Sequence, residues 1–188
     1  TTPIQSAVFP HVMSGIDLVG CAETGTGKTA AFLLPIMQRL LDAQLDAEDA
    51  GETRPQATRV LVLAPTRELA LQIEEDFQGL GYHTGLSGAA VFGGVAAGPQ
   101  DRALRAGVDL IVATPRRLLD HINSNAANFE SVEVLVLDEA DRMLDMGFWP
   151  DVRRIVSMLP ATRQTLLFSA TMSDEVTRSA SQIMRDPK

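Results

Sequence analysis

The sequence is poor in the residues on which several protein classes depend. Cys21 is its only cysteine, so no intrachain disulfide can form and a reducing, cytoplasmic setting is expected. The apolar neighbours of Cys21 predict a buried structural thiol rather than a reactive one. The three histidines, His11, His83 and His121, lack the spacing of metal ligands, so we interpret them as surface or packing residues.

Long apolar runs and an excess of positive charge are also missing. The apolar stretches fall far short of the roughly 20 residues that a membrane span requires, and no signal peptide is visible. A net charge of −8 argues against a general polyanion binder, so any contact with nucleic acid must be local. The length of 188 residues suits one domain, and because Thr1 is not an initiator Met we expect a trimmed chain.

Half of that net charge lies in one short segment. Residues 42–58 contain five acidic residues and one arginine, together with Gly51 and Pro55, and they show no periodic apolar pattern. A solvated charge run of this composition predicts a mobile surface loop rather than a binding site.

The dominant pattern is a repeated alternation of short apolar runs and amphipathic segments. The runs are continuous, as expected for strands covered on both faces, and comprise Ile16–Cys21, Val60–Ala64, Ala89–Phe92, Leu110–Ala113, Val132–Leu137 and Thr165–Phe168. The helical patterns between them are Thr29–Leu41, Arg67–Phe77, Gln100–Ala106, Arg116–Ile122, Pro150–Met158 and Asp174–Met184. This alternation predicts an α/β domain with a doubly wound, mostly parallel sheet and helices on both faces.

Individual residues indicate where some of these helices begin and end. Pro99 is expected to open one helix and Gly107 to close it. Ser173 is a suitable N-cap for the last helix, and Asp174 and Glu175 suit the positive end of its dipole.

The strongest local pattern is a glycine-rich segment between the first predicted strand and a predicted helix. It consists of Ala22, Glu23, Thr24, Gly25, Thr26, Gly27, Lys28 and Thr29. Glycines let the backbone wrap around phosphates, and the helix start adds the positive end of its dipole. Lys28 would reach the β- and γ-phosphates, and the Thr29 hydroxyl would ligate Mg²⁺. An ordinary glycine-rich turn is the alternative, and Ala22 does stand where the general pattern has its first glycine.

A second pattern places acidic residues directly after a buried strand. Asp138 follows the apolar run at the carboxyl end, where ligands bind in open α/β sheets, and Glu139 and Asp141 come next. Asp138 would hold Mg²⁺ through water, and Glu139 would orient and deprotonate the water that attacks the γ-phosphate. The alternative is that Asp138 caps the following helix, which the phosphate loop in the same chain disfavours.

Asp138-Glu139-Ala140-Asp141 spells DEAD, and the chain resembles the DEAD-box RNA helicases from Thr2-Pro3-Ile4-Gln5 to Ser169-Ala170-Thr171. The stretch Leu137–Phe148 is most similar to the bacterial RhlE-like group. The resemblance implies a RecA-like P-loop domain that binds ATP and Mg²⁺, and it implies that Gln5 reads the adenine edge. An amide donates and accepts together, so it matches adenine and disfavours guanine.

The resemblance also implies an RNA surface made of three turns. Its residues are Pro65, Thr66, Arg67, Gly93, Gly94, Thr114, Pro115 and Arg117. Hydroxyls and free N–H groups at strand-to-helix turns suit RNA phosphates, so little sequence specificity is expected. Taken singly, each turn would be read as simple helix capping. Arg116 stands where the family has Gly, and it would either add a phosphate contact or disturb the close approach of the backbone.

The remaining implied role is coupling between hydrolysis and strand separation. The resemblance assigns it to Ser169 and Thr171, which we expect to form hydrogen bonds to Asp141. The second RecA-like domain of the family, which supplies an arginine finger, is not found in the sequence, so we expect a monomeric fragment that hydrolyses ATP poorly. A nucleotide-controlled RNA-binding scaffold is the second hypothesis. A nucleotide kinase or GTPase is disfavoured by the Gln5 motif.

Overall fold

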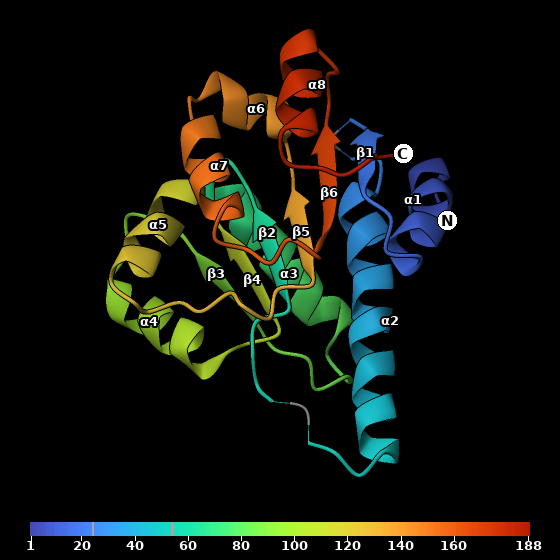
Figure 1. The fold of residues 1–188 in the computed structure, drawn as a ribbon, viewed down its shortest axis with the longest axis vertical. Helices are drawn as coiled ribbons and strands as arrows, with labels where there is room; N and C mark the ends of the chain where they lie inside the picture. Colours follow the sequence, from blue (N-terminus) through green and yellow to red (C-terminus); the bar gives the residue numbers. More distant parts are fainter. Residues whose placement is uncertain (24, 54) are drawn as a thin grey trace.

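The computed structural model describes residues 1–23, 25–53 and 55–188. In chain order the elements are α1 (Pro3–Met13), β1 (Leu18–Cys21), α2 (Lys28–Asp49), β2 (Val60–Leu63), α3 (Arg67–Leu80), β3 (Gly88–Val91), α4 (Ala97–Ala106), β4 (Leu110–Ala113), α5 (Pro115–Asn123), β5 (Val134–Leu137), α6 (Ala140–Asp145), α7 (Trp149–Val156), β6 (Gln164–Ser169) and α8 (Asp174–Ser181). Within the described residues six strands form one sheet in the order β1-β6-β5-β2-β4-β3 (Figure 1). Every neighbouring pair is parallel, so the predicted α/β fold is confirmed.

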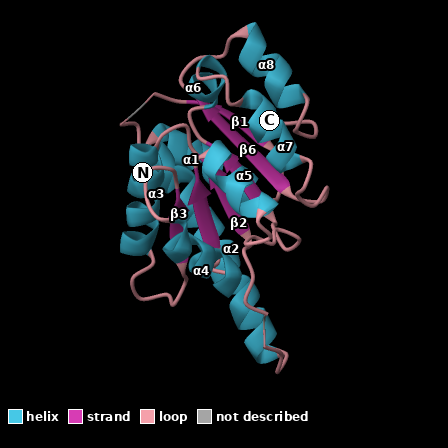
Figure 2. Cartoon of the chain, turned by 90° about the vertical axis from the view of Figure 1, so that its left-hand side faces the viewer, coloured by secondary structure: helices cyan, strands magenta, loops and turns pink. Residues whose placement is uncertain are grey.

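Successive strand residues supply two separate hydrophobic cores because side chains alternate between the faces of a sheet. On β2, Val60 and Val62 pack with residues of α1, α2 and α3. Leu61 and Leu63 pack on the other face with residues of α4 to α8. All four are fully buried, which explains why the run carries no polar residue. The helices thus lie on both faces of the sheet (Figures 1 and 2).

The second helix contradicts the predicted loop at residues 42–58, because α2 continues as far as Asp49. Its distal part extends beyond the sheet (Figures 1 and 2). Side-chain hydrogen bonds one turn apart support it: Gln38 Nε2 donates to Asp42 Oδ1 at 2.7 Å and Gln44 Nε2 donates to Glu48 Oε1 at 3.3 Å. Alanine, leucine and glutamine favour helix, and these local propensities outweigh the missing apolar periodicity. Arg54 lies outside the described residues.

Other boundaries differ in detail from the sequence predictions. The helix expected to open at Pro99 begins at Ala97, whereas Gly107 does end it, with a left-handed φ of 75°. Ser173 caps α8 by accepting a hydrogen bond from the Val176 N–H, as predicted. Two helices, α1 and α6, were not predicted; α6 has only six residues, and the proline at the start of α1 suggested a turn.

The prediction of a buried Cys21 is wrong. The thiol is exposed at the end of β1 and lies 3.7 Å from the carbonyl oxygen of Ala170. The reason is that β1 is an edge strand: Leu18 and Gly20 face the core beneath α2, while Val19 and Cys21 point to the less covered face. In the part of the chain that the structure describes, no helix is long and apolar enough to cross a membrane.

Candidate functional site

The predicted phosphate loop leads from β1 into the first turn of α2. Gly25 and Gly27 have φ angles of 83° and 84°, a left-handed conformation that only glycine adopts readily. Thr26 Oγ1 donates to the carbonyl of Glu23 at 2.8 Å and closes the turn. Ala22 is buried, and Thr24 lies outside the described residues. The loop therefore turns sharply and brings Lys28 to the N-terminus of α2.

The Gln5 side chain ties α1 to this loop. Its Nε2 donates to the carbonyl of Gly27 at 3.3 Å, and its Oε1 accepts from the Thr2 N–H at 3.0 Å. Among the described residues each amide atom has one hydrogen-bond partner, so one N–H and one lone pair remain for further hydrogen bonds. A Cβ at Gly27 would lie 2.6 Å from Gln5 Nε2, which shows how closely the two residues approach.

Asp138 faces the phosphate loop from the carboxyl end of β5. Its Oδ1 lies 2.7 Å from Lys28 Nζ and accepts from the Glu139 N–H at 2.9 Å. Among the described residues Oδ2 is buried and has no hydrogen-bond partner. Burial raises the pKa of the Asp138 carboxyl, and the neighbouring Lys28 ammonium opposes that shift. The structure thus brings together the lysine and the acid that the sequence assigned to one site.

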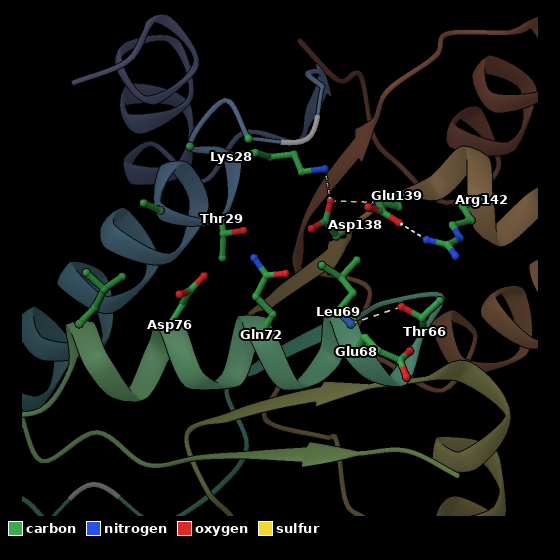
Figure 3. A pocket seen from close by; sticks show the side chains of 14 residues that line it. Lys28, Thr29, Thr66, Glu68, Leu69, Gln72, Asp76, Asp138, Glu139 and Arg142 are labelled. Carbon is green, nitrogen blue, oxygen red and sulfur yellow. Dashed lines mark hydrogen bonds and ion pairs between the residues drawn. The ribbon is translucent and has the colours of Figure 1, made fainter. Parts of the chain in front are cut away.

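These groups line a cleft of about 560 Å³ between the start of α2, α3 and the acidic strand end. Thr29, Thr66 and Glu139 also line it (Figure 3). A cleft of this size falls within the range of small-molecule sites. Predicted site residues from three separate stretches of sequence therefore share one cavity, whereas Gln5 is not among the residues that line it.

The cleft is also lined by residues that were not predicted as site residues, among them Gln72, Asp76 and Arg142 (Figure 3). Gln72 and Asp76 follow Glu68 at intervals of four residues on α3, which is the spacing of one helix face. That spacing was the available signal. Arg142 lies one turn after Glu139, and its guanidinium lies 3.4 Å from Glu139 Oε2.

Glu139 has an unusual backbone for its residue type. Its φ and ψ are 54° and 53°, the left-handed region, and it forms the N-cap of α6. A non-glycine residue in this region carries strain, which surrounding structure must hold in place. Here the turn allows β5 to end at Asp138 and directs the Glu139 side chain into the cleft (Figure 3).

Hydrogen bonds connect Asp141 to the end of β6, as expected from the sequence. Asp141 Oδ2 accepts from Thr171 Oγ1 at 3.0 Å and from the Thr171 N–H at 3.1 Å, while the Asp141 N–H donates to Ser169 Oγ at 3.3 Å. Partial burial would raise the pKa of Asp141, but the hydrogen bonds that its carboxylate accepts from Thr171 and from the Arg142 N–H lower the pKa overall.

The three turns of the predicted RNA surface follow β2, β3 and β4, which are neighbours in the sheet. Parallel strands end at one edge, so the turns lie along one side of the domain. Pro65 and Pro115 are buried at the starts of α3 and α5, whereas Gly93 and Gly94 are exposed. Thr66 Oγ1 caps α3 by accepting from the Leu69 N–H at 3.3 Å.

Two arginines lie against the Gly93–Gly94 turn from either side. The Arg67 guanidinium lies 4.9 Å from the centroid of the Phe92 ring, and Arg117 donates to the carbonyl of Val95 at 2.9 Å. Thr114, unlike Thr66, makes no side-chain cap, so capping does not account for its hydroxyl. The turn and the two arginines thus form one continuous polar surface.

Comparison with known proteins agrees with this arrangement. The profile of the DEAD/DEAH box helicase family matches residues 2–179. DEAD-box ATP-dependent RNA helicase 30 of Arabidopsis thaliana is 48% identical over 186 residues, 99% of this chain and 30% of that protein. DEAD-box ATP-dependent RNA helicase CshA of Bacillus cereus is 43% identical over 187 residues, 100% of this chain and 34% of that protein. The chain spans about a third of the length of these curated relatives.

Proposed function

Because the chain belongs to the DEAD/DEAH box helicase family, we propose that it is the ATP-binding domain of an ATP-dependent RNA helicase. It would couple the binding and hydrolysis of Mg-ATP to RNA binding and local duplex unwinding. The single observation that carries this proposal is the contact of 2.7 Å between Lys28 and Asp138, since it joins a phosphate loop to an acidic strand end within one cleft.

The cleft offers the groups that Mg-ATP needs. Lys28 and the backbone N–H groups of the loop would hold the phosphates at the start of α2. The unpartnered Oδ2 of Asp138 and the Thr29 hydroxyl are oxygen donors, the type that Mg²⁺ prefers, so the residues fit this ion. When bound there, Mg²⁺ would neutralise charge that develops on the phosphates.

Glu139 would accept a proton from the attacking water. Its side chain lines the cleft beside Asp138, and the hydrogen bond from Arg142 fixes one carboxylate oxygen. Gln5 would read the adenine edge with the N–H and lone pair that its bonds to Gly27 and Thr2 leave over. Glu139 would thus act in hydrolysis at the phosphates of ATP, whereas Gln5 would act in recognition of the adenine base.

RNA would bind along the three turns through its backbone. Thr66, Thr114 and the exposed N–H groups of Gly93 and Gly94 would contact phosphates, and the neighbouring arginines would add charge. Through the hydrogen bonds between Asp141 and Thr171, the end of β6 would respond to the nucleotide bound in the cleft. We propose coupling as the role of Asp141, Ser169 and Thr171.

Several finer points belong to the same proposal. A second RecA-like domain would supply the arginine finger, so these residues alone should hydrolyse ATP slowly. The likeness of Leu137–Phe148 supports placement in the RhlE-like group, and the single cysteine supports a cytoplasmic setting. The chain would act as a monomer. A nucleotide-controlled RNA-binding scaffold without useful catalysis is the second candidate, favoured by the self-contained RNA surface.

Calorimetric titration with ADP and with GDP in the presence of Mg²⁺ tests the proposal. We expect ADP binding without GDP binding, lost in Lys28→Ala and retained in Lys188→Ala, which removes the other lysine of the chain. Equal affinity for both nucleotides would remove the adenine-reading role of Gln5. Binding of neither would overturn the nucleotide site. RNA-stimulated turnover comparable to that of a complete helicase would contradict the expected slow hydrolysis.

A further inference from the structure

A buried polar cluster lies behind the proposed RNA surface, and none of the predicted motifs includes it. Its members are Gln100 and Asp101 on α4 and His121 on α5. Gln100 is 7% exposed and His121 is 3% exposed, so both are removed from water. Buried polar groups need partners, and the identity of these partners shows what the cluster does.

The Gln100 amide joins two parts of the RNA surface. Its Nε2 donates to the carbonyl of Phe92 at 3.0 Å, directly before Gly93. Its Oε1 accepts from Arg117 Nε at 3.4 Å. A carbonyl can only accept and a guanidinium can only donate, so these two partners fix which end of the amide faces which.

His121 holds the amide in that orientation. Its Nε2 lies 3.1 Å from Gln100 Oε1, and its Nδ1 lies 2.6 Å from Asp101 Oδ1. Because Gln100 Oε1 is an acceptor, Nε2 must donate to it. The Asp101 carboxylate is likewise an acceptor, so both ring nitrogens of His121 face an oxygen acceptor. Asp101 therefore anchors the ring, and the ring anchors Gln100.

The cluster consequently fixes the Gly93–Gly94 turn at both ends. On one side Gln100 holds the carbonyl of Phe92, whose ring lies against the Arg67 guanidinium. On the other side Arg117, itself bonded to Gln100, donates to the carbonyl of Val95 at 2.9 Å. Within the described residues this one amide connects two of the three turns directly, and the Phe92 ring extends the connection to Arg67 in the third.

We propose that Gln100 is a positioning residue for RNA binding, and that His121, anchored by Asp101, is what orients it. The inference rests on the proposed function, because it assigns these residues to the same RNA surface. Gln100 would hold the N–H groups of the exposed Gly93–Gly94 turn and the Arg117 guanidinium in place before RNA binds. Less free energy would then be spent on ordering this surface during binding. A buried histidine that merely fills the core is the competing explanation.

Two substitutions at His121 separate these explanations, because each places an amide nitrogen near only one of the two ring nitrogens. In His121→Gln the amide nitrogen stands near the position of Nε2 and can still donate to Gln100. In His121→Asn it stands near Nδ1 and can donate only to Asp101. Gln100→Ala removes the amide itself. His83→Asn, on an exposed histidine whose ring lies 4.9 Å from the Tyr82 ring between centroids, is the matched control.

The measurement is the affinity of the chain for a fluorescein-labelled single-stranded oligouridylate by anisotropy, with ADP affinity and unfolding temperature recorded for each variant. We expect RNA affinity to fall about tenfold in Gln100→Ala and about fivefold in His121→Asn, through loss of hydrogen bonds to charged groups. His121→Gln should stay within about twofold of the wild type, and ADP affinity should be unchanged throughout.

Three outcomes would contradict the inference, and they differ in what else they overturn. Equal RNA affinity in His121→Asn, His121→Gln and the wild type would overturn the positioning role while leaving the proposed function intact. RNA affinity that follows the unfolding temperature across the variants would show a packing role and overturn it as well. A wild-type chain that binds ADP but no oligouridylate would overturn RNA binding by this surface, and the inference with it.

Discussion

Lys28 Nζ lies 2.7 Å from Asp138 Oδ1, and both side chains are nearly or fully buried. The two residues are 110 positions apart in sequence, and β6 lies between β1 and β5, the strands that precede them in the chain. Each would be costly to bury alone, and together they neutralise one another. The groups assigned to phosphate and to metal thus also stabilise the cleft.

The first prediction concerns this ion pair. Lys28→Ala should abolish ADP binding and lower the free energy of unfolding by about 3 kcal/mol, because it leaves a buried carboxylate without its partner. Adding Asp138→Asn should restore roughly half of that loss, because the unpaired charge is removed with it. Urea denaturation at neutral pH measures both effects.

The second substitution should affect ADP binding differently from stability. The double variant should regain stability without regaining ADP affinity, since it lacks the ammonium that holds the phosphates. A double variant less stable than Lys28→Ala would show that the carboxylate is not destabilised by losing its partner, and would remove the electrostatic account.

The second prediction uses the two left-handed glycines of the phosphate loop as a matched pair. Gly25→Ala and Gly27→Ala should each cost about 1–2 kcal/mol, because both φ angles lie near 84°. Only at position 27 would the new Cβ meet Gln5, at 2.6 Å from its Nε2. Apart from its chain neighbours, no described residue comes within 4 Å of a Cβ at position 25.

Gly27→Ala should therefore displace the Gln5 side chain and reduce the preference for ADP over GDP, which Gly25→Ala should leave alone. Calorimetry with both nucleotides measures this preference. Adding Gln5→Ala to Gly27→Ala should relieve the close contact without relieving the backbone strain. If both alanine variants change the ADP preference equally, the contact with Gln5 does not set it.

Much of the fold could be predicted because its strands are short and buried on both faces. Continuous runs such as Val134–Leu137 leave no other reading in a chain of this length. The extension of α2 past Leu41 was missed because its polar residues give no apolar stripe, and local propensity with hydrogen bonds such as Gln38–Asp42 decides there. Cys21 was misjudged because sequence does not show which strand lies at the edge.

Some contacts of the candidate site could likewise be predicted from the sequence, and others could not. Lys28 and Asp138 could be paired from sequence because each follows a strand, and parallel strands end at one edge. Gln100 and His121 could not, since they lie on two helices and nothing in their spacing shows that the helices meet. Contacts between helices depend on packing, which a single sequence does not report.

The third prediction concerns the pH dependence of stability at Asp141. Its pKa in the folded chain is lowered from an ordinary value of 3.8, so the unfolded chain binds this proton more readily. The resulting stabilisation is fully present above pH 3.8 and is lost as pH falls through the lower, folded pKa. Asp141→Asn should lower stability at neutral pH by about 1–2 kcal/mol through lost hydrogen bonds to Thr171.

The gap between the wild type and Asp141→Asn should narrow as the solution is acidified below about pH 4, because the asparagine does not titrate. Urea denaturation from neutral pH to about pH 3.5 measures the gap at each step. A gap that stays constant over this range would mean that the lowered pKa of Asp141 does not contribute. Asp145→Asn, on an exposed acid of the same helix, is the control.

The last prediction concerns Arg116, at the position where the resemblance to the family led us to expect Gly. Its side chain is 73% exposed, its Nε lies 3.5 Å from Asp151 Oδ2, and its guanidinium lies 5.4 Å from the centroid of the Phe148 ring. Among the described residues only Nε is in an ion pair, so the terminal nitrogens can reach a phosphate. Arg116→Ala should change stability by less than about 0.5 kcal/mol, as for other exposed ion pairs.

RNA binding should respond more than stability does. Arg116→Ala should weaken the affinity for oligouridylate, and the slope of log affinity against log salt should become less steep by about one unit. Arg105→Ala removes the same charge from the last turn of α4, away from the strand ends, and should leave the slope unchanged. Tighter RNA binding in Arg116→Gly would instead favour the steric alternative, in which the Arg116 side chain keeps the RNA backbone from approaching α5. Loss of a positive charge should otherwise weaken binding to a polyanion, so only the steric explanation accounts for a gain in affinity.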